Sequence, residues 1–104
     1  MKPETQDWID DSDYDLQSAK AMLESGRYFF VVFMCHLTIE KLLKAFIVER
    51  QGIEPPKIHS LVGLVTRVGV AIPAEHRSLI DQLNTMSVVT RYPDGRRAIA
   101  SLLT

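Results

Sequence analysis

The chain has 104 residues, of which 46% are hydrophobic and 24% charged, a composition that fits one globular domain with one core. Its formal net charge of −1 excludes a protein that is basic overall, but residues 1–40 hold eight acids and three bases, and residues 41–104 hold nine bases and five acids. This asymmetry suits self-association through complementary faces or a local basic site, although acids also gather at helix starts for electrostatic reasons alone.

The first helix is predicted from about Thr5 to Ser25, because apolar residues recur there at helical spacing while acids and Lys20 fill the other face. Gly26 is a candidate cap at its C-terminal end, and the connection to the next helix is very short, which predicts two antiparallel neighbours. The apolar face carries Trp8, Ile9, Leu16, Ala19, Met22 and Leu23.

The stretch from Tyr28 to Gln51 predicts a central helix around which the chain is organised. It is apolar on almost every face, so other helices must pack on most of its sides. Its single cysteine, Cys35, is expected to be a small buried hydrophobe. Because a monomer of this size cannot bury so much apolar surface, we expect a homodimer that buries part of this helix or its neighbours.

The same stretch is long enough to span a bilayer. Its ionisable side chains would then lie in hydrocarbon at high cost, so a core or interface helix of a soluble protein is favoured. The acidic start of the chain does not resemble a secretory signal, and a cytoplasmic location is expected. The ionisable side chains of the central helix are His36, Glu40, Lys41 and Lys44.

Strong helix breaks follow the central helix. Gly52 ends it, and Pro55 and Pro56 prevent its continuation. Ser60 is a candidate N-cap for a short helix from Leu61 to Val68.

The last third of the chain predicts two more helices. Gly69 ends the preceding helix, and Pro73 suits the first position of a fourth one. The run Tyr92-Pro93-Asp94-Gly95 is a turn signal, and Arg96 to Leu103 reads as a last short helix. The apolar face of the fourth helix carries Leu79, Ile80, Leu83 and Met86. The prediction is therefore one all-α domain over residues 1–104, an up-and-down four-helix bundle with a short additional terminal helix.

Polar residues of the central helix allow two interpretations. His36 and Glu40 are four residues apart, a spacing that can place two metal ligands on one helical face. The simpler interpretation is a hydrogen-bonded histidine and an intrahelical pair between Glu40 and Lys44. No His-Glu-x-x-His, glycine-rich phosphate loop or Gly-x-Ser-x-Gly motif occurs. We therefore favour the simpler interpretation, and predict neither a metal nor a cofactor.

Several cationic side chains in the second half of the chain are candidates for an anion site, because arginine suits bidentate phosphate contact. A solvated surface charge is the simpler alternative for any one of them. The candidates are Lys41, Lys44, Lys57, His59, Arg91, Arg96 and Arg97.

The order of four short motifs resembles the HEPN domain family, small helical proteins of prokaryotes with relatives in larger eukaryotic proteins. The resemblance runs from Trp8 to Asp94 and implies a helical bundle, a homodimer, and frequent pairing with a minimal nucleotidyltransferase in two-component or toxin-antitoxin systems. After Trp8 and Asp15-Leu16, the motifs read LESGRY at residues 23–28, IEKLLKA at 39–45, PPKIHSL at 55–61 and RYPD at 91–94.

Many members of that family look like metal-independent ribonucleases, whose activity depends on an arginine followed four to six residues later by a histidine. This chain lacks that motif, because no histidine follows Arg91 and the other arginine-histidine pairs have eight residues between them. Those pairs are Arg27 and His36, Arg50 and His59, and Arg67 and His76.

The resemblance without the ribonuclease motif implies a non-catalytic module that binds a nucleotide or a partner protein. The alternative is a divergent ribonuclease in which His59 is the general acid or base and Arg91 stabilises developing charge. The expected ligand or anion contacts are Lys44, His59, Arg91, Tyr92 and Lys41.

Overall fold

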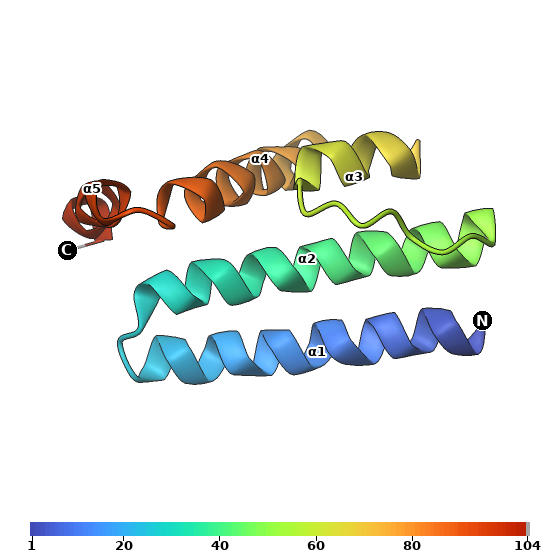
Figure 1. Cartoon of the computed structure of the whole chain (residues 1–104), viewed down its shortest axis with the longest axis horizontal. Helices are drawn as coiled ribbons and strands as arrows, with labels where there is room; N and C mark the ends of the chain where they lie inside the picture. The colour runs from blue at the N-terminus through green and yellow to red at the C-terminus, as the bar shows by residue number, and fades with distance from the viewer. Residues whose placement is uncertain (104) are drawn as a thin grey trace.

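The structure, a computed structural model, describes residues 1–103 of the chain and the side chains of residues 1–101. This part of the chain is all-α, as predicted, with no strand, and no helix in it is long and apolar enough to cross a membrane. Helices α1 and α2 lie side by side along the long axis, and α3 and α4 lie on the other side of α2 (Figure 1). The helices are α1 (Pro3–Glu24), α2 (Tyr28–Gln51), α3 (Leu61–Val68), α4 (Ala74–Val89) and α5 (Pro93–Leu103).

The α1 helix packs against α2 through a narrow strip. Its buried residues include the small Ser12 and Ala19, which let the two helices approach closely. Leu16 and Leu23, predicted on the core face, are instead 37% and 56% exposed. Because α1 contacts mainly α2, only one side of its apolar face packs against another helix. Leu16 and Leu23 lie beside that contact and stay exposed.

The α2 helix has the predicted bounds, and it supplies the core on the side away from α1. Gly52 ends it in the left-handed conformation, with φ of 67°, and donates its N–H to the carbonyl of Val48. Two clusters of buried side chains join α2 to α3 and α4, and Leu43 packs against both: Ile47, Leu64 and Val68 form one, and Leu61, Val65 and Ile80 the other. Cys35 is partly rather than fully buried, and this burial raises the pKa of its thiol.

Helix α3 has the predicted bounds and cap. The Ser60 hydroxyl accepts the N–H of Gly63 at 3.1 Å, and Gly69 ends the helix with φ of 71°. The side-chain oxygen of Asn84 on α4 accepts the N–H of Leu61 at 2.9 Å. The start of α3 is thereby tied both to its own cap and to α4.

The end of the chain differs from the prediction. Helix α4 begins at Ala74, one residue after the position expected for Pro73, and continues to Val89. Helix α5 begins at Pro93 rather than Arg96, so the expected turn residues form its first helical turn. Proline suits that place because it needs no N–H there. Gly95 fits because a Cβ at this position would collide with the carbonyl of Val89.

Candidate functional site

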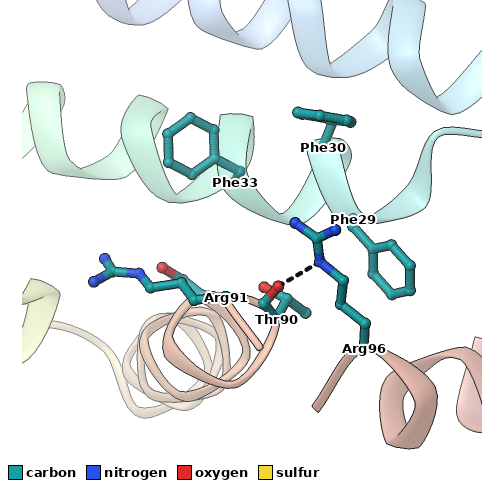
Figure 2. Close-up of a pocket in the computed structure, with 7 residues that line it drawn as sticks. Phe29, Phe30, Phe33, Thr90, Arg91 and Arg96 are labelled. Atoms are coloured by element: carbon teal, nitrogen blue, oxygen red, sulfur yellow. Dashed lines mark hydrogen bonds between the residues drawn. The ribbon is translucent and has the colours of Figure 1, made fainter. Parts of the chain in front are cut away.

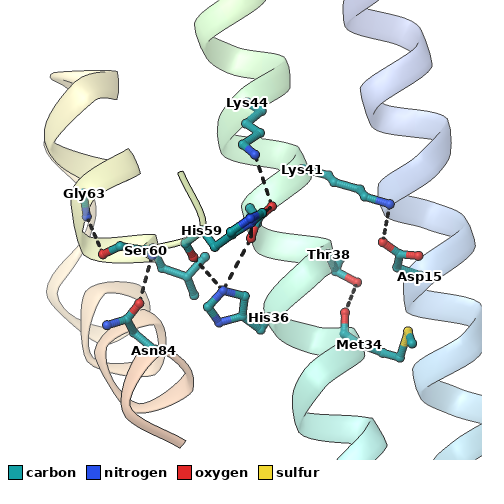
Figure 3. Close-up of polar contacts among 12 residues, drawn as sticks. Asp15, Met34, His36, Thr38, Lys41, Lys44, His59, Ser60, Gly63 and Asn84 are labelled. Atoms are coloured by element: carbon teal, nitrogen blue, oxygen red, sulfur yellow. Dashed lines mark hydrogen bonds and ion pairs between the residues drawn. The ribbon is translucent and has the colours of Figure 1, made fainter. Parts of the chain in front are cut away.

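A buried polar cluster occupies the side of α2 that faces the connection to α3. His36, Glu40 and Lys44 are successive i,i+4 neighbours and are 4%, 4% and 6% exposed. One carboxylate oxygen of Glu40, Oε2, lies 3.2 Å from Lys44 Nζ and 3.2 Å from Nδ1 of His59. The other, Oε1, lies 3.5 Å from Nε2 of His36. Figure 3 shows the side chains of His36, Lys44 and His59 between α2 and the segment before α3.

His36 fastens this segment to α2. Its Nε2–H donates to the backbone carbonyl of His59 at 2.8 Å. The other ring nitrogen, Nδ1, is buried and has no hydrogen-bond partner in the described part of the chain. Because Nε2 of His36 is bonded to this carbonyl, His36 positions the backbone of His59. This is the hydrogen-bonded histidine that the sequence analysis favoured over a metal ligand.

The Glu40 carboxylate is held in its charged form. Burial by itself raises its pKa, but hydrogen bonds from His36, His59 and Lys44, together with the charge of Lys44, outweigh that effect. The net result is a pKa lowered to about 2. Glu40 is therefore an anion over the whole neutral range, and it orients every donor around it.

His59 is oriented at two points while its side chain stays open to solvent. Its carbonyl is held by His36, and its Nδ1–H donates to the Glu40 carboxylate at 3.2 and 3.3 Å. The side chain is nevertheless 73% exposed. With Nδ1 turned toward the carboxylate, Nε2 is the ring nitrogen left for a ligand. A carboxylate fixes a histidine in the same way where histidine acts as a general base.

His59 and Arg91 line the same cavity, of about 220 Å³. The two residues come from separate segments, and the sequence predicted both as ligand contacts. The Arg91 guanidinium has no ion pair or hydrogen bond among the residues that the structure describes. It is thus a cation without a counter-charge beside an oriented imidazole. The other residues lining the cavity are Phe33, His36, Leu37, Glu40 and Ser87.

The other predicted contacts lie elsewhere or in supporting positions. Lys41 forms an ion pair with Asp15 on α1 at 2.8 Å, so its charge is used in packing α1 against α2. Lys44 lies behind Glu40, with its ammonium 5.7 Å from the centre of the Trp8 ring. Tyr92 is 65% exposed and does not line this cavity.

A second cavity, of about 340 Å³, adjoins the first and shares Phe33, Ser87 and Arg91 with it. Phenylalanine rings and two arginines surround it, as Figure 2 shows. The Arg96 Nε–H donates to the carbonyl of Thr90 at 2.7 Å, and its guanidinium lies 5.6 Å from the ring centre of Phe29. The remaining lining residue is Phe30.

This aromatic cavity was not predicted, because apolar residues of the central helix were assigned to the core or a dimer interface. Phe30 and Phe33 are 52% and 44% exposed. No sequence signal indicated this cavity. Its phenylalanines lie at the start of α2 and its arginines near the end of the chain, and only the fold brings them together. Arg97, another predicted cation, pairs instead with Asp94.

In residues 1–103, no group of three or more His, Cys, Asp or Glu side chains is arranged to hold a metal ion. The family model described as HEPN domain matches residues 5–100, nearly the whole chain. None of the curated proteins and none of the solved structures matched.

Proposed function

Because this chain belongs to the HEPN domain family, we propose that it is a binding module of that family whose ligand is a nucleotide. The ligand occupies the cavity that His59 and Arg91 share, and no catalysis follows. One observation carries this proposal. A guanidinium with no ion pair in the described part of the chain and a carboxylate-oriented imidazole open into a single cavity that continues along aromatic side chains.

The charges in the cavity favour a phosphate. The Arg91 guanidinium offers two parallel N–H donors. Because Nδ1–H of His59 is directed at Glu40, its Nε2 donates to a phosphate oxygen when the ring is protonated and accepts from a ligand hydroxyl when the ring is neutral. The Glu40 carboxylate lies nearby, but Lys44 at 3.2 Å offsets its negative charge. Glu40 therefore aims His59 without giving the site a net negative charge.

The aromatic cavity suits the base of the same nucleotide. Bases stack on aromatic side chains, and such contacts contribute about 1 to 3 kcal/mol each. Phe30 and Phe33 expose ring surface next to Arg91, so a phosphate on Arg91 places the base within reach of those rings.

The test is calorimetric titration with ATP, GTP and inorganic phosphate. We expect Arg91→Met and His59→Gln to weaken nucleotide binding at least tenfold. Arg67→Met is the matched control, because Arg67 is also exposed but lies at the end of α3 outside both cavities. Equal affinities of the Arg91 and Arg67 variants, or no binding by the unmodified chain, would contradict the proposal.

A divergent ribonuclease is the second candidate, and the bond from His59 to Glu40 favours it specifically. An imidazole fixed by a carboxylate can move a proton from a ribose hydroxyl, and Arg91 can stabilise charge on the phosphate. An RNA digest distinguishes the candidates. Cleavage lost in both His59→Ala and Arg91→Ala supports the ribonuclease, whereas identical residual cleavage in both variants points to a contaminating enzyme.

We also propose that this single domain forms a homodimer through α1. Leu16 and Leu23 are seven residues apart, so they share one face of the helix, and both are exposed. HEPN domains commonly dimerise. Light scattering should give twice the chain mass at micromolar concentration, and Leu23→Glu should shift it toward the monomer. A monomer mass for the unmodified chain would refute this interface.

The proposed partner protein is a minimal nucleotidyltransferase, in a cytoplasmic two-component or toxin-antitoxin system. Its support is the family membership together with the absent ribonuclease motif. Co-expression with a small nucleotidyltransferase encoded beside this gene, followed by size-exclusion chromatography, tests it. Separate elution of the two proteins would contradict it.

A further inference from the structure

A third cavity, of about 530 Å³, lies at the other end of α2, between the start of α1 and the residues that follow Gln51. It shares no lining residue with the two cavities of the candidate site. Its volume is within the range of small-molecule sites, roughly 300 to 1,000 Å³. The lining residues are Lys2, Glu4, Trp8, Val48, Gly52, Ile53, Glu54 and Pro55.

The apolar part of this cavity is preformed. Val48 and Pro55 are buried, Trp8 is partly buried, and Ile53 is half exposed. The Trp8 indole is braced from within the protein by the Lys44 ammonium, 5.7 Å from its ring centre. A ligand therefore meets an ordered wall that offers both apolar contact and the face of an indole.

Three charged side chains line the cavity, and its two carboxylates outnumber its one ammonium. Lys2 is already committed, because its Nζ donates to the carbonyls of Val48 at 3.1 Å and Glu49 at 3.4 Å at the end of α2. Glu4 and Glu54 form no ion pair within the described part of the chain. The start of the α1 helix favours a negative charge at Glu4. Glu54 lies between α2 and α3, away from the start of any described helix.

We propose that this cavity binds a small organic cation, an alkylammonium or alkylguanidinium compound. Its alkyl part lies on Trp8 and Ile53, and its charged end lies between Glu4 and Glu54. The two carboxylates, which form no ion pair in the described part of the chain, attract the charged end, and contact with Trp8 and Ile53 removes the alkyl part from water. An anion would be repelled by the same carboxylates, and a neutral ligand would gain nothing from them. The site does not depend on the nucleotide-binding function proposed above.

Fluorescence of Trp8 gives a direct readout, because it is the only tryptophan in the chain. The probes are butylguanidinium chloride and butylammonium chloride, and 1-butanol is the neutral analogue of the same alkyl length. We expect a saturable change of Trp8 fluorescence with both cations, and at least tenfold weaker binding of butanol. Calorimetry with the same three compounds checks that the signal reports binding.

The variant Glu4→Gln with Glu54→Gln should weaken binding of both cations at least tenfold. Its matched control is Glu24→Gln with Glu75→Gln, which removes two exposed carboxylates from elsewhere at the same net charge. All four positions are exposed, and circular dichroism verifies that each variant is folded. The proposal is overturned if no cation gives a saturable signal, if butanol binds equally well, or if the two double variants lose the same affinity.

Discussion

Replacing Glu40 by glutamine tests the centre of the candidate site most directly. The amide keeps the size and some hydrogen bonds of the carboxylate but removes its charge. Lys44, which is 6% exposed, is then left without its counter-charge, and His59 loses its charged acceptor. Leaving one member of a buried ion pair unpaired is strongly destabilising. We therefore expect Glu40→Gln to lower the free energy of unfolding.

The magnitude follows from the pKa of Glu40, which folding lowers from an ordinary 4.5 to about 2. At about 1.4 kcal/mol for each tenfold change in acid dissociation, this corresponds to roughly 3 kcal/mol. Because the folded-state pKa is the lower one, the contribution is complete above pH 4.5 and is lost as the pH falls toward 2. Glu40→Gln should thus cost about 3 kcal/mol at pH 7 and much less near pH 2.

Urea unfolding followed by Trp8 fluorescence measures this difference at a series of pH values. The pKa of Glu49 is also lowered, first by the backbone N–H of Lys2 and then by the Thr5 hydroxyl. Glu49 therefore contributes to acid sensitivity, so the informative quantity is the difference between the unmodified chain and the Glu40 variant at each pH. A second replacement, Lys44→Met, should recover part of the loss, because it removes the unpaired charge. A Glu40→Gln variant within about 0.5 kcal/mol of the unmodified chain at pH 7, with the same acid sensitivity, would refute this reasoning.

Three further predictions concern helix ends and the cysteine. Gly95→Ala should destabilise the chain by about 1 to 3 kcal/mol in urea unfolding, because the new Cβ meets the Val89 carbonyl. Gly63→Ala should instead raise the free energy of unfolding by up to about 1 kcal/mol, because its Cβ makes ordinary contacts within a helix. A Gly95 variant as stable as the Gly63 variant would contradict this close approach. Ser60→Ala should cost about 1 kcal/mol through loss of the α3 cap, with an unchanged melting temperature as the contrary result. Cys35 should react with iodoacetamide more slowly in the folded chain than in urea, since burial raises its thiol pKa; equal rates would show that it is accessible.

Local chain chemistry allowed most helix bounds to be predicted. Gly52 and Gly69 end helices because each adopts the left-handed conformation, and Ser60 caps α3 with its own side chain. Such signals act within a few residues and can be read from the sequence. The predicted start of α5 was wrong because Pro93 fits both a turn and the first helical position, and the local sequence does not decide between them.

The candidate site depended on contacts between distant segments, and so was predicted only in part. His59 and Arg91 were expected as ligand contacts, and the fold brings them to one cavity. No local pattern indicates that His36 holds the carbonyl of His59, 23 residues away. Likewise, Lys41 and Lys44 differ by only three positions, yet the first pairs with α1 and the second with the buried Glu40.

The hydrogen bonds that join the start of α1 to Glu49 near the end of α2 affect how the chain folds during synthesis. Lys2 and Thr5 bond to Glu49 while the chain reverses at Gly26, so the α1–α2 hairpin is fastened at both ends once residue 52 has left the ribosome. That half-made protein still displays Leu43 and Ile47, whose partners on α3 and α4 have not yet left the ribosome. We therefore expect a fragment ending at residue 52 to be helical but prone to aggregation, and the nascent chain to need protection until α4 emerges.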